Sequence, residues 1–161
     1  MESAQTVRKE FGQGMGDISR FWGFSPVLGQ MYALLYLSNA PIPAEAIGKA
    51  LGISKGNVSM TLKTLERWGM IRRSRQVGER KEFYEAETDF GRIFVNVLTE
   101  RRNKEFDRSL KTVASCLEQL PRGDKTKESV FLRERLLRLQ RFFTSLDTTV
   151  LTLLKLLKPI G

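Results

Sequence analysis

Apolar residues recur at helical spacing along most of the chain. Residues 4–21 show a weakly amphipathic helical pattern, although three glycines within it lower the intrinsic stability of such a helix. A second helix is predicted from Ser25, a preferred N-cap residue, and Pro26, a preferred first helical residue, to about Leu37. The N-terminal region is therefore predicted to be helical and to need packing for its stability.

Two further helices are predicted next, and a short turn separates them. The first covers residues 43–51 and ends at Gly52, because glycine readily adopts the left-handed conformation that closes helices. The second covers residues 54–68, with Ser54 as its N-cap and Gly69 after its last turn. It carries one apolar stripe, made of Val58, Leu62 and Leu65. The opposite face is small, polar or basic, which is typical of a helix with one buried side.

The one departure from helical spacing lies between residues 70 and 86. Residues 70–77 and 81–86 are rich in strand-forming or alternating residue types, and Gly78-Glu79-Arg80 separates them. This pattern predicts a β-hairpin with a polar, basic tip. A helix, a turn containing glycine, a second helix and a hairpin follow one another in the order of a winged helix-turn-helix.

The C-terminal half is predicted to hold two long helices. The first covers residues 88–120, is capped by Thr88 or Asp89, and has two apolar sets out of register, which predicts a phase shift near Arg101. The chain breaks at Pro121-Arg122-Gly123-Asp124, and the last helix covers residues 127–157. This last helix carries a heptad seam of apolar residues at alternating steps of four and three: Leu132, Leu136, Leu139, Phe143, Leu146, Val150, Leu153 and Leu157.

Helices with such seams cannot bury them alone. The two long helices are expected to pack on each other, on the N-terminal helices, or on a second copy of the chain, and dimerisation is the most economical solution. The predicted fold is thus mostly α with a small β-hairpin: a winged helix-turn-helix with long C-terminal dimerisation helices. The winged helix-turn-helix with its N-terminal helices is assigned to residues 1–87, and the helical dimerisation region to residues 88–161.

The charge of the chain favours a polyanionic partner. Its 161 residues include 27 Lys and Arg against 18 Asp and Glu, a net charge of +9. Residues 54–82 alone hold eight basic and three acidic residues, a net charge of +5, so the positive charge is concentrated where DNA would lie.

Several classes of function are excluded by composition. The chain has no His and a single Cys, Cys116, which excludes imidazole catalysis, His-bound zinc and an internal disulfide. We therefore expect no enzyme, no metal and no cofactor. The N-terminus lacks the pattern of a signal peptide, and no apolar run approaches the roughly 18 residues of a membrane span. These features predict a cytoplasmic protein with no membrane partner.

The predicted DNA contacts lie on the second helix of the helix-turn-helix and on the hairpin. Small residues there permit close approach to base edges, Lys63 and Arg67 can reach guanine or phosphate, and Arg80 suits the minor groove. For any single basic residue, a solvated charge is the alternative interpretation. The predicted set is Ser54, Lys55, Gly56, Asn57, Ser59, Met60, Lys63, Thr64, Arg67, Arg72, Arg73, Arg75, Arg80 and Lys81.

Specific residues in this region resemble a known family. The segments 51–60, 68–69, 71–73 and 78–86 look like those of the MarR-type winged-helix regulators, and within them like the glycine-betaine-synthesis regulator branch. The similarity extends over roughly residues 8–110. It implies a homodimer with interlocking terminal helices, two recognition helices in successive major grooves of double-stranded DNA, and repression. After Leu120 the chain departs from the family pattern.

The resemblance also implies a small-molecule effector. Members of that branch are linked to choline or related osmolytes, whose quaternary ammonium group needs an aromatic cage. The candidate cage residues are Phe21, Trp22, Phe24, Tyr32, Tyr36 and Trp68. The alternative is that these aromatics belong to the core and to interfaces.

Two functional hypotheses from different classes remain. The first is a homodimeric, sequence-specific repressor that an effector releases from DNA. The second is a helical interaction module that recruits a partner protein through its C-terminal heptads.

Overall fold

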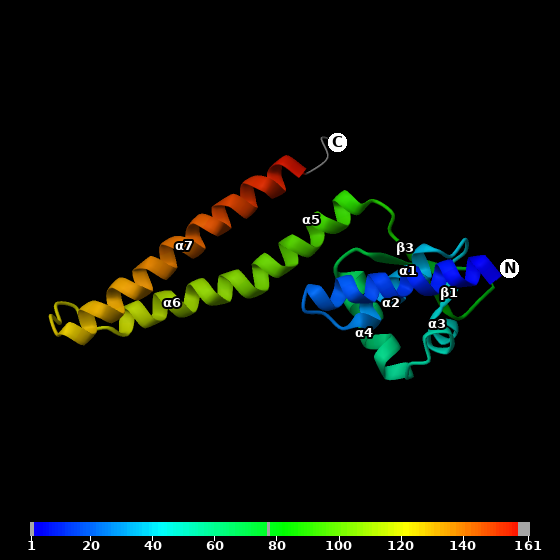
Figure 1. Cartoon of the computed structure of the whole chain (residues 1–161), viewed down its shortest axis with the longest axis horizontal. Coiled ribbons are helices and arrows are strands. Elements are labelled where there is room, and N and C mark those ends of the chain that lie inside the picture. The colour runs from blue at the N-terminus through cyan, green and yellow to red at the C-terminus, as the bar shows by residue number, and fades with distance from the viewer. Residues whose placement is uncertain (1, 77, 158–161) are drawn as a thin grey trace. The chain divides into compact units, whose positions relative to one another are not determined.

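The computed structural model describes residues 2–76 and 78–157, without the side chains of residues 2, 105 and 157. The chain folds into two compact units that divide between Ile93 and Phe94 (Figure 1). We call residues 2–93 the winged-helix unit and residues 94–157 the helical unit. The predicted fold class, mostly α with a small sheet and long C-terminal helices, is confirmed.

The elements of the winged-helix unit follow the predicted order. In sequence they are α1 (Glu2–Phe21), α2 (Pro26–Tyr36), β1 (Ile42–Pro43), α3 (Ala44–Leu51), α4 (Lys55–Arg67), β2 (Ile71–Arg75) and β3 (Glu82–Ala86). Ser54 caps α4 by accepting a hydrogen bond from the backbone N–H of Asn57 at 3.3 Å. Gly52, directly after α3, and Gly69, two residues after the end of α4, have positive φ angles of 64° and 65°. The predicted start and end signals of the helix-turn-helix are therefore confirmed.

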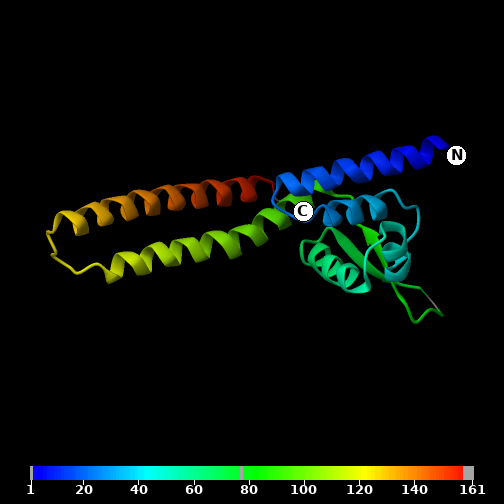
Figure 2. The same ribbon diagram turned by 60° about the horizontal axis from the view of Figure 1, so that its bottom comes forward.

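Helices α1 and α2 lie side by side (Figure 2). At Gly29 of α2, an added Cβ would lie 2.0 Å from the backbone oxygen of Met15, a distance that no real side chain tolerates. Gly16 of α1 is also buried at this contact. Gly16, one of the three glycines that weaken α1 as an isolated helix, thus lies where α1 packs closely against α2.

The sheet has one strand more than the predicted hairpin. β2 and β3 pair antiparallel as expected, and β3 also pairs with β1, which gives the strand order β1-β3-β2. Tyr84 of β3 lies opposite Ile42 on one side and Arg73 on the other. The predicted end of the first hairpin strand at Val77 lies outside the described residues.

The long helix predicted from residue 88 to residue 120 has an interruption. Asp89 accepts a hydrogen bond from the backbone N–H of Arg92 at 3.0 Å, which identifies it as the cap of α5 (Phe90–Arg101). A π-helical turn follows at residues 102–106, and the chain continues as α6 (Asp107–Gln119). A π turn contains an extra residue and rotates the apolar face. The predicted phase shift near Arg101 is confirmed, and this turn is its cause.

In the helical unit, α6 and α7 (Lys127–Leu157) run antiparallel and side by side (Figures 1 and 2). Phe106 packs edge-on against Phe143, with ring centroids 6.0 Å apart. Arg102 donates to both carboxylate oxygens of Asp147, at 2.6 and 3.0 Å. A ring contact and an ion pair therefore link the two halves of this hairpin.

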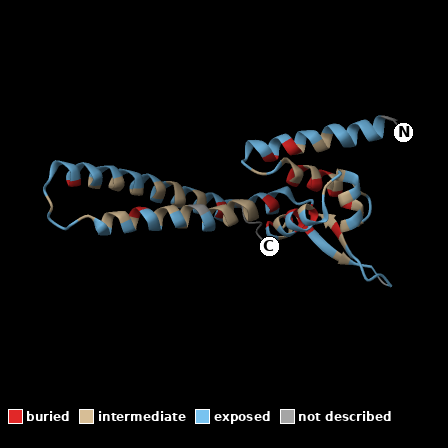
Figure 3. Cartoon of the chain, turned by 90° about the horizontal axis from the view of Figure 1, so that it is seen from below, coloured by how far each residue is buried: buried red, intermediate tan, exposed pale blue. Residues whose placement is uncertain are grey.

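The heptad seam of α7 divides into two sets by burial. Leu136, Phe143, Leu146 and Val150 are half-buried, whereas Leu132, Leu139 and Leu153 are exposed by 41%, 42% and 43%. The side chain of Leu157 lies outside the described residues. Figure 3 shows that buried residues are sparse along these helices. Part of the seam is therefore available to another surface.

Across the described residues, no helix combines the length and the apolar character that a membrane span requires.

Candidate nucleic-acid interface

Helix α4 has one buried and one exposed side, as its sequence predicts. Val58, Leu62 and Leu65 are at most 3% exposed, and Thr61 joins them in the core. The opposite side carries exposed Gly56, Ser59, Met60, Lys63 and Arg67, with Met60 68% exposed. A helix fixed by its buried stripe presents this face rigidly, which suits the reading of a DNA groove.

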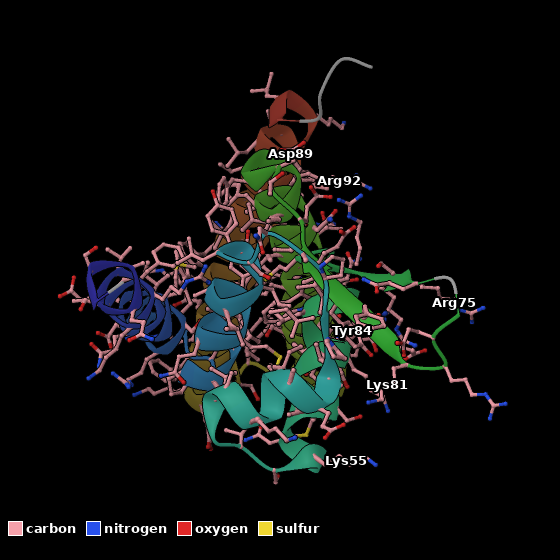
Figure 4. The ribbon with its side chains drawn as sticks, turned by 90° about the vertical axis from the view of Figure 1, so that its right-hand side faces the viewer. Lys55, Arg75, Lys81, Tyr84, Asp89 and Arg92 are labelled. Atoms are coloured by element: carbon pink, nitrogen blue, oxygen red, sulfur yellow. The ribbon has the colours of Figure 1, made fainter. Side chains whose placement is uncertain are left out.

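The wing, formed by β2, β3 and the turn between them, is basic and extends away from the body of its unit (Figure 2). Figure 4 shows Arg75 and Lys81 pointing outward from the wing, and Lys55 pointing outward at the start of α4. Arg80 is exposed at the turn. The structure thus places the predicted basic contacts of α4 and of the wing within one unit.

A groove of about 890 Å³ opens between α3, α4 and the two long strands of the wing. Its lining has both signs of charge, and it is shaped by Glu45, Lys49, Lys55, Lys63, Glu66, Arg73 and Glu82. Glu45 pairs with Lys49 at 3.1 Å and with Lys81 at 3.6 Å. These two lysines, through the hydrogen bond from Lys49 first, hold the pKa of Glu45 below its usual value.

The basic residues of the interface differ in how far protein groups already engage them. Arg72 lies 3.7 Å from Glu85, and Arg73 is bonded to two carboxylates. Among the described residues, neither Lys63 nor Arg80 has an ion-pair partner. Lys63 and Arg80 therefore offer their whole charge to a ligand, whereas Arg73 does not.

Asn57 also has an internal partner that the sequence did not predict. Its side-chain oxygen accepts a hydrogen bond at 3.2 Å from the hydroxyl of Thr61, which is buried. The amide is thereby oriented, with its NH₂ group left to donate to a ligand.

Sequence reasoning missed three residues that organise this surface. Glu66 on α4 accepts hydrogen bonds from Arg73, seven residues later in the sequence, and Glu82 on β3 accepts one from the same arginine. The hydroxyl of Tyr84 donates to Glu82 at 3.1 Å. The only sequence signal was acidic residues within a basic segment, and their partners depend on the folded hairpin.

The aromatic residues proposed for an effector cage lie in different surroundings. Tyr32 is 1% exposed and its hydroxyl donates to the backbone oxygen of Glu87 at 2.8 Å. Burial raises its pKa to about 12. Phe21, by contrast, is 83% exposed and contacts Trp22 edge-on. Because one of these rings is buried and another is in solvent, they do not line one enclosed site in this chain.

The other candidate aromatics pack against core rings. Phe24 lies against Trp68, with centroids 4.6 Å apart, and Tyr36 stacks on Tyr32 at 5.8 Å. Trp68 is buried at the end of α4. These contacts stabilise the winged-helix unit.

Comparisons with known proteins agree with this fold. The chain is similar to a crystal structure of a transcriptional regulator with a TM-score of 0.66, at 18% identity, over 92% of this chain and 96% of that one. Weaker likenesses include a Staphylococcus aureus MepR mutant bound to an oligodeoxyribonucleotide (TM-score 0.43, 20% identity, 86% and 96% coverage). Another is Streptococcus pneumoniae FabT in complex with DNA (0.40, 18%, 90% and 94%). The comparison with curated proteins found no match.

The fold and the geometry of this face define a winged helix-turn-helix protein. Residues 16–82 match the family model described as the MarR family. That segment, which contains α2 to β2, is thus similar to the MarR family.

Proposed function

We propose that this chain is a sequence-specific, DNA-binding transcription regulator that acts as a homodimeric repressor. The observation that carries the proposal is the exposed basic face formed by α4 and the wing on a MarR-type segment. In this proposal α4 is the recognition helix in the major groove, and the wing contacts the backbone and the minor groove. A regulator of this kind works in the cytoplasm, where its DNA is accessible.

The separate residues have separate tasks in the proposal. The free backbone N–H groups at the start of α4, beside Ser54 and Lys55, suit a phosphate oxygen. The exposed small residues Gly56 and Ser59 let base edges approach, and Lys63 reaches guanine or phosphate. Two such surfaces, one from each copy, read a site with approximate twofold symmetry.

The neighbouring structures support this proposal only as analogies. Two of them are complexes with DNA or with an oligodeoxyribonucleotide. Release of the repressor by a choline-like effector is the finer part of the proposal. Its test is whether such osmolytes weaken DNA binding.

The first experiment selects bound sites from a random or genomic DNA library and measures affinity for the recovered duplex at several salt concentrations. Lys63→Ala and Arg80→Ala should each weaken binding about fivefold to tenfold. Each should also reduce the slope of log affinity against log salt by about 0.9 per lost phosphate contact. Lys125→Ala removes an exposed charge from the turn between α6 and α7 and serves as the matched control. A Lys63→Ala/Arg80→Ala pair that binds like the wild type contradicts the proposal.

A second candidate function rests on the exposed part of the α7 seam. Leu132, Leu139 and Leu153 would suit a foreign helix as well as a second copy of this chain. Native mass spectrometry separates the two. A monomer that associates only with another protein supports the interaction module, and a dimer of the pure chain supports the regulator.

A further inference from the structure

One arginine of the predicted DNA-binding set is bonded to the protein itself. Arg73, on β2, donates from Nε and Nη2 to the two carboxylate oxygens of Glu66 in the last turns of α4, with the Nη2 bond at 2.9 Å. Its remaining nitrogen, Nη1, donates to Glu82 on β3 at 2.9 Å. All three guanidinium nitrogens of Arg73 are therefore engaged by carboxylates.

The cluster extends to the aromatic residue opposite Arg73. Tyr84 donates to the second oxygen of Glu82 at 3.1 Å, and the Arg73 guanidinium lies 6.0 Å from the centre of the Tyr84 ring. Tyr84 is 5% exposed, so it is a fixed support. We call Glu66, Arg73, Glu82 and Tyr84 the clamp. The hydrogen bond and the charge of Glu66 raise the pKa of Arg73 above its usual value.

The clamp joins the two elements that the proposed function brings to DNA. Glu66 belongs to α4, whereas Arg73 lies in the middle of β2 and Glu82 begins β3, directly after the turn of the wing. Two binding surfaces of a protein reinforce each other only when the distance between them matches the distance between their two sites on the ligand. A bidentate arginine–carboxylate pair restrains both distance and orientation.

The acidic residues within the basic segment also favour a link between α4 and the wing. Of the three acidic residues within residues 54–82, Glu66 and Glu82 are bonded to Arg73. Because DNA is negatively charged, an acidic residue beside it weakens binding by repulsion. Such a residue is therefore expected to have a compensating role in the protein. Holding Arg73 explains why these two carboxylates stand in a basic segment.

We propose that Arg73 is a positioning residue that fixes the angle between α4 and the wing through Glu66 and Glu82 and makes no contact with DNA itself. The proposal rests on the proposed function, since it assigns a role within the same interface. It replaces the backbone contact that the sequence suggested for Arg73.

The experiment compares Glu66→Gln, Arg73→Gln, their double variant and the control Arg80→Gln on the selected duplex. Glu66→Gln removes a negative charge, which alone would tighten DNA binding, yet the loss of the clamp should weaken binding about tenfold. Arg73→Gln should weaken binding equally, with the wild-type salt slope. Arg80→Gln should lower that slope by about 0.9. The double variant should bind no more weakly than either single variant, because both remove one interaction.

Two results overturn the clamp. One is Glu66→Gln binding as tightly as the wild type or more tightly, and the other is Arg73→Gln lowering the salt slope as Arg80→Gln does. Thermal unfolding of each variant identifies any effect of misfolding, and Arg73→Lys, which keeps the charge but not the bidentate pair, should also bind weakly. If the wild type and Arg80→Gln bind every duplex alike, the proposed function fails rather than the clamp.

Discussion

The two units of the chain differ in how much of their apolar surface they bury by themselves. Among the described residues, thirteen of the fifteen buried hydrophobic side chains belong to the winged-helix unit. The helical unit contributes Val113 and Leu154. The winged-helix unit therefore has a core of its own, whereas the helical unit is an amphipathic hairpin with apolar side chains left in solvent.

The two units also differ in net charge. Residues 1–93 hold 13 basic and 10 acidic residues, and residues 94–161 hold 14 and 8, so the net charges are +3 and +6. In the first unit the net positive charge comes from residues 54–82, which carry +5, whereas the rest of that unit carries −2. In the second it surrounds the apolar seam. This arrangement implies that salt should weaken DNA binding, while it should strengthen pairing between two copies of the helical unit.

The largest effect is expected at the contact between α1 and α2. Gly29→Ala places a Cβ 2.0 Å from the backbone oxygen of Met15, so α1 must move away from α2. We expect a loss of about 3 kcal/mol in the free energy of unfolding, measured by urea denaturation. An unfolding curve like that of the wild type would mean that α1 does not pack as the structure has it.

These helices also show why much of the fold could be predicted from the sequence. Start and end signals such as Ser54 and Gly52 act within a few residues, so they are readable locally. The phase shift was readable because periodicity measures the rotation of a helix face. β1 could not be predicted, because its two residues become a strand only by pairing with β3, about 40 residues away.

The candidate site shows the same limit. The exposed face of α4 could be predicted, because the helical spacing of its apolar residues identifies the buried side and therefore the opposite face. The engagement of Arg73 was not predicted, because Glu66 and Glu82 approach it only after β2 and β3 have paired. The heptads of α7 predicted a seam but not its division into half-buried residues such as Leu136 and Phe143 and exposed residues such as Leu139.

The second largest effect should appear in the association of two chains. Leu139→Glu would bury a charge in the proposed dimer contact and raise the dissociation constant roughly hundredfold. Native mass spectrometry or analytical ultracentrifugation measures it. The winged-helix unit should keep its stability, because its core is separate.

Val130→Glu is the matched control for this change. It introduces the same charge on the same helix at a residue that is exposed by 45% and lies outside the seam. If both variants dissociate equally, net charge rather than the seam controls association. If neither dissociates, the dimer contact lies elsewhere.

A smaller effect is expected inside the helical unit, at the π turn. Arg102 and Asp147 form a bidentate ion pair with side chains 22% and 17% exposed. The hydrogen bond to Asp147 is the first cause that raises the pKa of Arg102. A double-mutant cycle with Arg102→Met and Asp147→Asn should give a coupling of about 1.5 kcal/mol in unfolding. Additive effects would indicate that solvent screens the pair.

The smallest predicted effect is a stabilisation by a glycine-to-alanine substitution, the same kind of change that should destabilise the protein at Gly29. Gly14→Ala lies on α1 at a site where an added Cβ meets nothing within 4 Å, whereas Gly29→Ala meets backbone. Alanine in a helix is favoured over glycine by roughly 0.5–1 kcal/mol, so Gly14→Ala should raise the melting temperature. Stabilisation by Gly14→Ala together with destabilisation by Gly29→Ala would show that packing, rather than helix propensity, requires the glycine at α2. If Gly14→Ala also destabilises the protein, its exposed side of α1 contacts something outside the single chain, and the winged-helix unit is less self-sufficient than its core suggests.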